Sequence, residues 1–215
     1  MGRLHRISVH PRGILRGMLE AVRGSEQLLV RPGEPLPLLL LSFPRGRLAV
    51  ARETEVAYAH VLPRLRAETR APYERVLALL PSLVVVLLRS FNPCGCLGHH
   101  HPRGAESRLT RRLAGELGRS VAEIDLAYDG IRSWRPQPLS EMATGEPAGR
   151  LAATHFQAGV LAVMLHEFEH LALPESSEAE TRARSNWFYS MAMQELVAEE
   201  CGAVYGMASP LPPRP

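Results

Sequence analysis

The residues most able to do chemistry lie in one short apolar segment, Leu165-His166-Glu167-Phe168-Glu169-His170-Leu171. On a helix, His166 and His170 are four residues apart and point in the same direction. Two imidazoles at that spacing can bind one zinc ion, and Glu167 can act as general base toward water at the metal. The alternative is a pair of core histidines bonded to backbone or carboxylate groups, because so short a pattern also arises by chance.

A second acidic pattern lies downstream, where Gln194-Glu195-Leu196-Val197-Ala198-Glu199 places two carboxylates one helical turn apart. Catalytic zinc takes three protein ligands and leaves a fourth position for water, so the histidine pair needs a partner. We expect a turn at Pro174 to bring the next helix back antiparallel, with Glu195 as the third ligand. Glu199 would then accept a hydrogen bond from the imidazole of His166. The alternative for both carboxylates is a solvated acidic face.

The combination of His166-Glu-x-x-His170 with Glu195-x-x-x-Glu199 resembles the gluzincin metallopeptidases of the thermolysin kind. Locally, Gln-Glu-Leu-Val-Ala-Glu-Glu-Cys-Gly-Ala is similar to a stretch in the zincin-like domains of antirestriction and polyvalent proteins of mobile elements. The resemblance covers about residues 160–206. It implies one catalytic Zn²⁺ held by the two histidines and Glu195, with Glu199 supporting the first histidine. Glu167 would carry a proton from zinc-bound water to the leaving amine of a cleaved peptide.

Peptide hydrolysis also requires a donor that stabilises the oxyanion. Tyr189, Tyr205 and His155 are the candidates, and the sequence does not choose among them. His155 lies three helical turns from His166, which favours a structural role for it.

The other conspicuous stretch is Asn92-Pro93-Cys94-Gly95-Cys96-Leu97-Gly98-His99-His100-His101. Cys94, Cys96, His99 and His101 are candidate ligands of an accessory or structural metal. The stretch lacks a second Cys or His pair at the spacing of a standard zinc knuckle or ribbon. An unliganded polar loop and a cleft-lining or regulatory role, including a thiolate that enters the zinc site, are therefore alternatives.

Composition limits the class of protein. The chain has 215 residues, of which 46% are hydrophobic, enough for one domain with a sizeable core. All 25 basic residues are arginines and the formal charge is only +3, so composition does not argue for a nucleic-acid partner. Three cysteines make a disulfide framework improbable, and the apolar runs are too short to span a bilayer. We expect no secretory signal, a cytoplasmic, reducing location and no membrane partner.

The order of patterns predicts an α+β, zincin-like fold in which N-terminal strands pack on a buried zinc-binding helix and an antiparallel Glu-bearing helix follows. Strands are expected over 6–10, 27–30, 38–43, 47–51 and 84–88, with a hairpin turn at Pro44-Arg45-Gly46. Helices are expected over 14–22, 53–80 (interrupted, with Pro72 in the first turn of a second helix), 108–117, 120–134, 150–173 and about 177–205. Capping boxes of Ser120 with Glu123 and of Ser177 with Glu180 are expected to begin the helices over 120–134 and 177–205. Residues 92–104 are expected to form a loop and 135–149 a connector.

These elements would form one domain over 1–209, with a strand-rich half over 1–104, a helical half over 105–209 and a disordered tail over 210–215.

Three functions fit these patterns. The leading one is a zinc metallopeptidase acting on a peptide or protein, which an edge strand of the sheet could align by strand addition. The second is a zinc-stabilised, non-catalytic regulatory module of a mobile element. The third is a basic nucleic-acid-binding protein that uses Arg108, Arg111 and Arg112, although a solvated basic face explains that helix better. The sequence leaves the substrate and the oligomeric state open.

Overall fold

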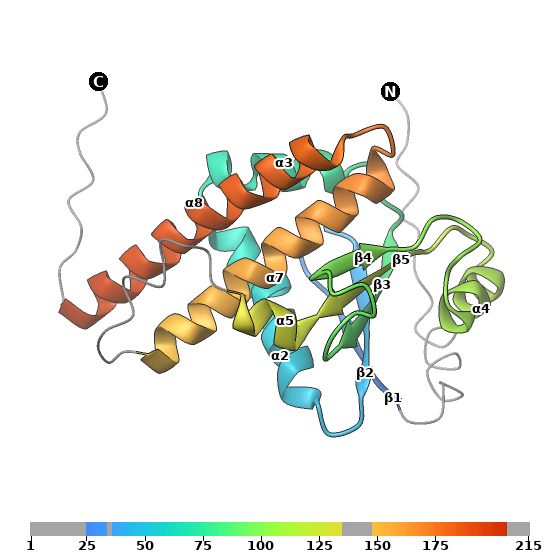
Figure 1. The fold of residues 1–215 in the computed structure, drawn as a ribbon, viewed down its shortest axis with the longest axis horizontal. Coiled ribbons are helices and arrows are strands. Elements are labelled where there is room, and N and C mark those ends of the chain that lie inside the picture. Colours follow the sequence, from blue (N-terminus) through green and yellow to red (C-terminus); the bar gives the residue numbers. More distant parts are fainter. Residues whose placement is uncertain (1–24, 34–35, 135–147, 206–215) are drawn as a thin grey trace.

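A computed structural model describes residues 25–33, 36–134 and 148–205 of the chain. In this part of the molecule one sheet is covered by helices on both faces, a mixed α+β arrangement (Figure 1). The expected strand over 6–10, the helix over 14–22, most of the connector and the tail lie outside the described residues. None of the helices in the described ranges combines the length and apolar character that crossing a bilayer requires.

The sheet of the described residues has five strands in the order β1-β2-β3-β5-β4. Strands β2, β3 and β5 are parallel, whereas β1 and β4 run antiparallel to their neighbours at the two edges. Their bounds are Ser25–Val30 for β1, Leu38–Pro44 for β2, Leu83–Arg89 for β3, Gly98–His100 for β4 and Ala122–Ala127 for β5. The predicted strands over 27–30, 38–43 and 84–88 are therefore confirmed.

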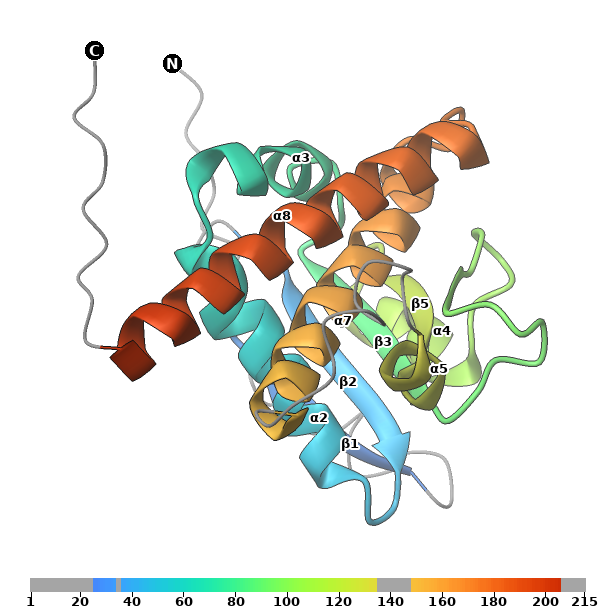
Figure 2. The same cartoon turned by 60° about the vertical axis from the view of Figure 1, so that its left-hand side comes forward.

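Alternating side chains along the central strands enter two separate cores. On β3, Val84 and Val86 join the large core under the long helices, whereas Leu83 and Val85 join the small core under helix α4, Arg108–Leu117. Burial on both faces explains why these strands are almost continuously apolar. Figures 1 and 2 show α4 on the opposite side of the sheet from the long helices.

The crossover from β2 to β3 is helical. It consists of α2 (Leu48–Val56), two short non-α helical turns (Ala57–Val61 and Leu62–Arg64) and α3 (Ala67–Leu77). The prediction of a strand over 47–51 after a hairpin turn is wrong. Both edges of β2 are already paired, with β1 and β3, so the chain after β2 must leave the sheet. Pro72 lies inside α3 rather than in its first turn.

Two further predictions are wrong around β5. The expected loop over 92–104 contains strand β4, and the expected helix over 120–134 is strand β5 followed by the short helix α5, Tyr128–Ser133. The sequence suggested that Glu123 completes a capping box with Ser120. In the structure its carboxylate accepts hydrogen bonds from Ser107, the N-cap residue of α4. Strand β5 thus brings residues from the expected helical half into the sheet.

Two long antiparallel helices complete the fold, as predicted. Helix α7 spans Ala148–Ala172, and helix α8 spans Glu178–Tyr205 and packs beside it (Figure 2). The predicted capping box begins α8: the Glu180 N–H donates to Ser177 Oγ, and the Ser177 N–H donates to Glu180 Oε2, both at 3.3 Å. The connection between the helices is therefore short.

Candidate metal centre

Helix α7 brings His166 and His170 together, as the sequence predicts. Their Nε2 atoms lie 3.3 Å apart, and the two rings meet edge-on. The side chains are 17% and 14% exposed, so each ring is largely enclosed but its outer edge is accessible. Most of α7 around them is buried against the sheet and α8, which fixes the helix on which the pair depends.

The carboxylate nearest to this pair belongs to Glu178, the first residue of α8. Its Oε2 atom lies 3.4 Å from His166 Nε2 and 3.1 Å from His170 Nε2. Burial acts to raise the pKa of Glu178, but the hydrogen bond from Arg182 and the adjacent histidines outweigh it. The pKa therefore lies below its ordinary value, and the carboxylate is ionised at neutral pH.

The three ligand-type atoms form a triangle with sides of 3.1, 3.3 and 3.4 Å. Zinc binds imidazole nitrogen and carboxylate oxygen at about 2.0–2.2 Å, and two ligands of a tetrahedral ion are then about 3.3–3.6 Å apart. The triangle thus nearly matches one face of a tetrahedral zinc site. A fourth position above that face would remain for water or substrate.

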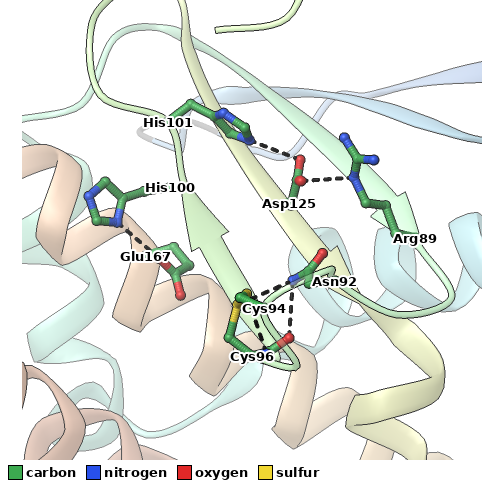
Figure 3. Close-up of a disulfide and its surroundings, with 8 residues drawn as sticks. All are labelled: Arg89, Asn92, Cys94, Cys96, His100, His101, Asp125 and Glu167. Atoms are coloured by element: carbon green, nitrogen blue, oxygen red, sulfur yellow. Dashed lines mark hydrogen bonds and ion pairs between the residues drawn. A yellow bond between two sulfur atoms is a disulfide. The ribbon is translucent and has the colours of Figure 1, made fainter. Parts of the chain in front are cut away.

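Glu167 lies beside this triangle and is only 5% exposed. Its Oε2 atom is 3.2 Å from Nδ1 of His100, and the His100 ring stacks on His170 with centroids 5.0 Å apart. His100 comes from the edge strand β4, which lies against α7 (Figure 3). This role of His100 was not predicted from the sequence, although the run of three histidines is conspicuous there.

Strand β4 can approach α7 because one of its residues is glycine. A Cβ atom on Gly98 would lie 2.6 Å from both Glu167 Oε1 and Val163 Cγ1, well inside van der Waals contact. Gly98 therefore lets the strand backbone pass directly over the candidate base.

A cavity of about 780 Å³ opens over these residues. Its lining comes from the loop and strand at 94–100, from Trp134, from the exposed face of α7 and from the first turns of α8, including Arg182, Ser185 and Asn186. Glu167, both histidines and Glu178 all line it, so a ligand of peptide size can reach the triangle.

The expected ligand Glu195 lies elsewhere. Its carboxylate accepts hydrogen bonds from the backbone N–H of Arg66 at 2.8 Å and from the Thr69 hydroxyl at 2.5 Å, near the start of α3. Glu199 is paired with Arg64 rather than with His166. The prediction that Glu195 and Glu199 contact the two histidines is therefore wrong.

The length of the turn between α7 and α8 explains the correction. Helix α8 begins only eight residues after His170, so its first residue, Glu178, faces the end of α7. Glu195 follows 17 residues later, about 26 Å further along the helix axis. The capping box at Ser177 was the sequence signal that pointed to a short turn and thus to Glu178.

A buried ion pair fixes the two helices behind the triangle. Glu169 is 1% exposed and accepts hydrogen bonds from Arg184 and from the Thr181 hydroxyl, both on α8. Burial acts to raise the pKa of Glu169, but the hydrogen bonds and charge of Arg184 outweigh it and hold the pKa below its ordinary value. This pair sets the register that brings Glu178 to His170.

The predicted oxyanion donors are not at the triangle. His155 Nδ1 and the Tyr189 hydroxyl lie 2.8 Å apart, and His155 Nε2 lies 3.2 Å from the carbonyl oxygen of Ile131, all in the core. This placement agrees with the structural role favoured for His155. The Tyr205 side chain lies outside the described residues, and its backbone position is about 40 Å along α8 from Glu178.

The four residues predicted as ligands of an accessory metal do not come together as one site. Cys94 and Cys96 are joined in a disulfide, and Cys201 is free and exposed. The ligand atoms of Cys94, Cys96 and His99 lie within 4.8 Å of one another, but disulfide sulfurs are not thiolate ligands. His101 turns instead toward Asp125 (Figure 3). The single disulfide of the described residues is local to this loop and forms no framework.

The basic helix α4 is remote from the triangle, on the other face of the sheet. Arg108 and Arg111 are exposed, whereas Arg112 pairs with Glu116 at 2.8 Å along the same helix. This is the pattern of a solvated helix face.

Comparison with known proteins adds no relative. No family model matches the chain, and neither the curated proteins nor the solved structures yield a significant match.

Proposed function

We propose that the chain is a zinc-dependent metallopeptidase of zincin-like fold, with His166, His170 and Glu178 as the metal ligands. The single observation that carries this proposal is the triangle of their ligand atoms, whose sides are close to those of one face of a tetrahedral zinc site. The likeness to gluzincins is retained in the ligand types, since a glutamate on the following helix supplies the third ligand. Its position in the sequence differs from the one that the motif suggested.

Glu167 is the proposed general base. Zinc bound at the triangle would polarise a peptide carbonyl and acidify a bound water. Glu167 lies beside the triangle, enclosed but lining the cavity. It would accept one proton from the attacking water and deliver it to the amide nitrogen as the carbon–nitrogen bond breaks. His100, 3.2 Å from Glu167 Oε2, would orient this carboxylate.

The substrate class follows from the edge strand. Strand β4 is the last strand in the sheet order of the described residues, and all three of its residues line the cavity. An extended peptide added beside β4 would form main-chain hydrogen bonds and place a carbonyl over the triangle. A peptide or protein is therefore the proposed substrate, in preference to a small molecule held only by side chains.

The test is hydrolysis of a peptide library by the zinc-loaded full chain, read by mass spectrometry. Glu167→Gln is expected to lower cleavage by about 10²–10⁴-fold while zinc stays bound, because it removes only the proton carrier. Glu199→Gln is the matched control: it changes an exposed carboxylate paired with Arg64 and should leave cleavage unchanged. A chain that binds zinc at the triangle but cleaves no peptide would contradict the proposal and favour the silent, zinc-stabilised module.

A further inference from the structure

A second cluster of ligand-type side chains lies on the other side of strand β4 from Glu167. Adjacent residues on a strand point to opposite faces, so His100 turns toward α7 and His101 turns the other way (Figure 3). His101 Nε2 lies 3.2 Å from Asp125 Oδ1 and 3.7 Å from Glu123 Oε1, both on β5. The ligand atoms of the three residues all lie within 4.8 Å of one another.

The cluster concentrates negative charge inside the protein. Glu123 is fully buried and Asp125 is 5% exposed. Arg89 pairs with Asp125 Oδ2 at 2.8 Å and supplies one positive charge. A second buried carboxylate requires a further cation, because an uncompensated charge away from water is costly.

Two atoms of the cluster have no hydrogen bond. Asp125 Oδ1 and His101 Nε2 are both buried and face each other at 3.2 Å, yet neither has a hydrogen-bond partner. The distance alone would allow a hydrogen bond between the two atoms, but none is formed. The geometry instead resembles that of two lone pairs directed at a common point, as around a metal ion.

The remaining groups around the cluster are held in place. The Glu123 carboxylate accepts hydrogen bonds from the Ser107 N–H at 2.9 Å and from the hydroxyls of Ser107 and Thr110. The backbone N–H of His101 donates to the Glu123 carbonyl at 3.1 Å. Ligands fixed in this way lose little conformational freedom when they bind an ion.

We propose that His101, Glu123 and Asp125 form a second metal site, for a divalent ion of the zinc class. One imidazole with two carboxylates suits zinc better than magnesium or calcium, which prefer oxygen ligands alone. The separations of 3.2 and 3.7 Å are close to the roughly 3.3–3.6 Å expected between two ligands of a tetrahedral zinc ion. The ion would fasten the end of β4 to β5, next to the strand residues that contact Glu167. This site does not depend on peptidase activity.

The experiment counts zinc in a full chain that lacks the other candidate ligands. His166→Gln with His170→Gln removes the triangle, and Cys94→Ser with Cys96→Ser removes both cysteine sulfurs. This parent chain is loaded with zinc chloride, dialysed and measured by elemental mass spectrometry, with circular dichroism to verify that it is folded. One zinc per chain is expected.

Two further measurements locate that ion. Asp125→Asn in the parent is expected to weaken zinc binding by at least about 10²-fold, since it removes a charged ligand. Glu106→Gln, which changes a nearby carboxylate outside the cluster, should not weaken it. Anomalous scattering at the zinc edge from crystals of the parent should give a peak between His101 and Asp125, and this readout does not require any Asp125 variant to fold.

Two results would overturn the proposal. A folded parent that binds no zinc would mean that His101, Glu123 and Asp125 form no metal site. An anomalous peak at any other residues would place the metal elsewhere. Neither result bears on the triangle, which the parent lacks, so failure here is distinguishable from failure of the proposed peptidase.

Discussion

Glu178→Gln tests which carboxylate completes the metal centre. Structural zinc sites with four protein ligands bind with about 10–16 kcal/mol, or about 2.5–4 kcal/mol per ligand. Loss of one of three ligands should therefore raise the zinc Kd by about 10²–10³-fold. Folding should change little, because the ion pair that Glu178 forms with Arg182 is exposed and such pairs contribute less than about 1 kcal/mol.

Glu195→Gln is the matched control, since it makes the same chemical change on the same helix. Its carboxylate bonds only the start of α3 in the described structure, so the zinc Kd should stay within about twofold of wild type. The free energy of unfolding should fall instead, by about 1–2 kcal/mol, because a part-buried hydroxyl and a backbone N–H lose a charged acceptor.

The assay is competition with a chromogenic zinc chelator at neutral pH, together with urea denaturation of each zinc-free variant. Each substitution should therefore change a different property, with Glu178→Gln lowering zinc affinity and Glu195→Gln lowering stability. If Glu195→Gln lost zinc affinity by about 10²-fold and Glu178→Gln did not, the short-turn geometry would be refuted. The original sequence-based ligand assignment would then be correct.

Two other substitutions probe the surroundings of the triangle. Gly98→Ala should lower peptide cleavage by about 10²-fold with zinc retained, measured as kcat/KM, because the new Cβ displaces Glu167. Glu169→Gln should lower the free energy of unfolding by about 1.5 kcal/mol at pH 7, since Arg184 is left without its partner. The folded-state pKa of Glu169 is lowered, so this difference should be complete above about pH 5 and vanish as the pH falls through that pKa, in urea titrations across pH.

Each of these has a contrary outcome. A Gly98→Ala chain with unchanged kcat/KM would show that β4 does not control the position of Glu167. An equal loss of stability at pH 3 and pH 7 in Glu169→Gln would assign its effect to packing rather than to charge. Gly115→Ala is a suitable control for the first, because the Cβ it adds meets no atom within 4 Å.

The local part of the site was readable from the sequence. The spacing of His166 and His170 decides their common direction once the segment is helical, because the helix repeat acts over a few residues. The capping box at Ser177 is likewise a local pattern, and it begins α8 where predicted. The apolar strands β2 and β3 were readable because burial on both faces leaves a continuous β-branched and leucine run.

Two segments whose local sequence pattern fits more than one secondary structure were predicted wrongly. Residues 120–127 fit a capping box followed by a helix, but residues 122–127 form strand β5 because an open edge of β3 pairs with them. The same tertiary pairing makes a strand of 98–100 inside a segment whose composition indicates a loop. Propensity could not decide either case, since sheet formation depends on partners distant in sequence.

The sequence alone determined that two histidines and Glu167 share one buried helix, because that arrangement needs only the helical repeat. Only the tertiary structure decided what meets them. The choice of Glu178 over Glu195 depends on the length of a turn and the register of two packed helices. The placement of His100 beside Glu167, and of His101 among two carboxylates, depends on which face of an edge strand each residue occupies. A one-residue shift in that strand would exchange them, and no local pattern specifies its register.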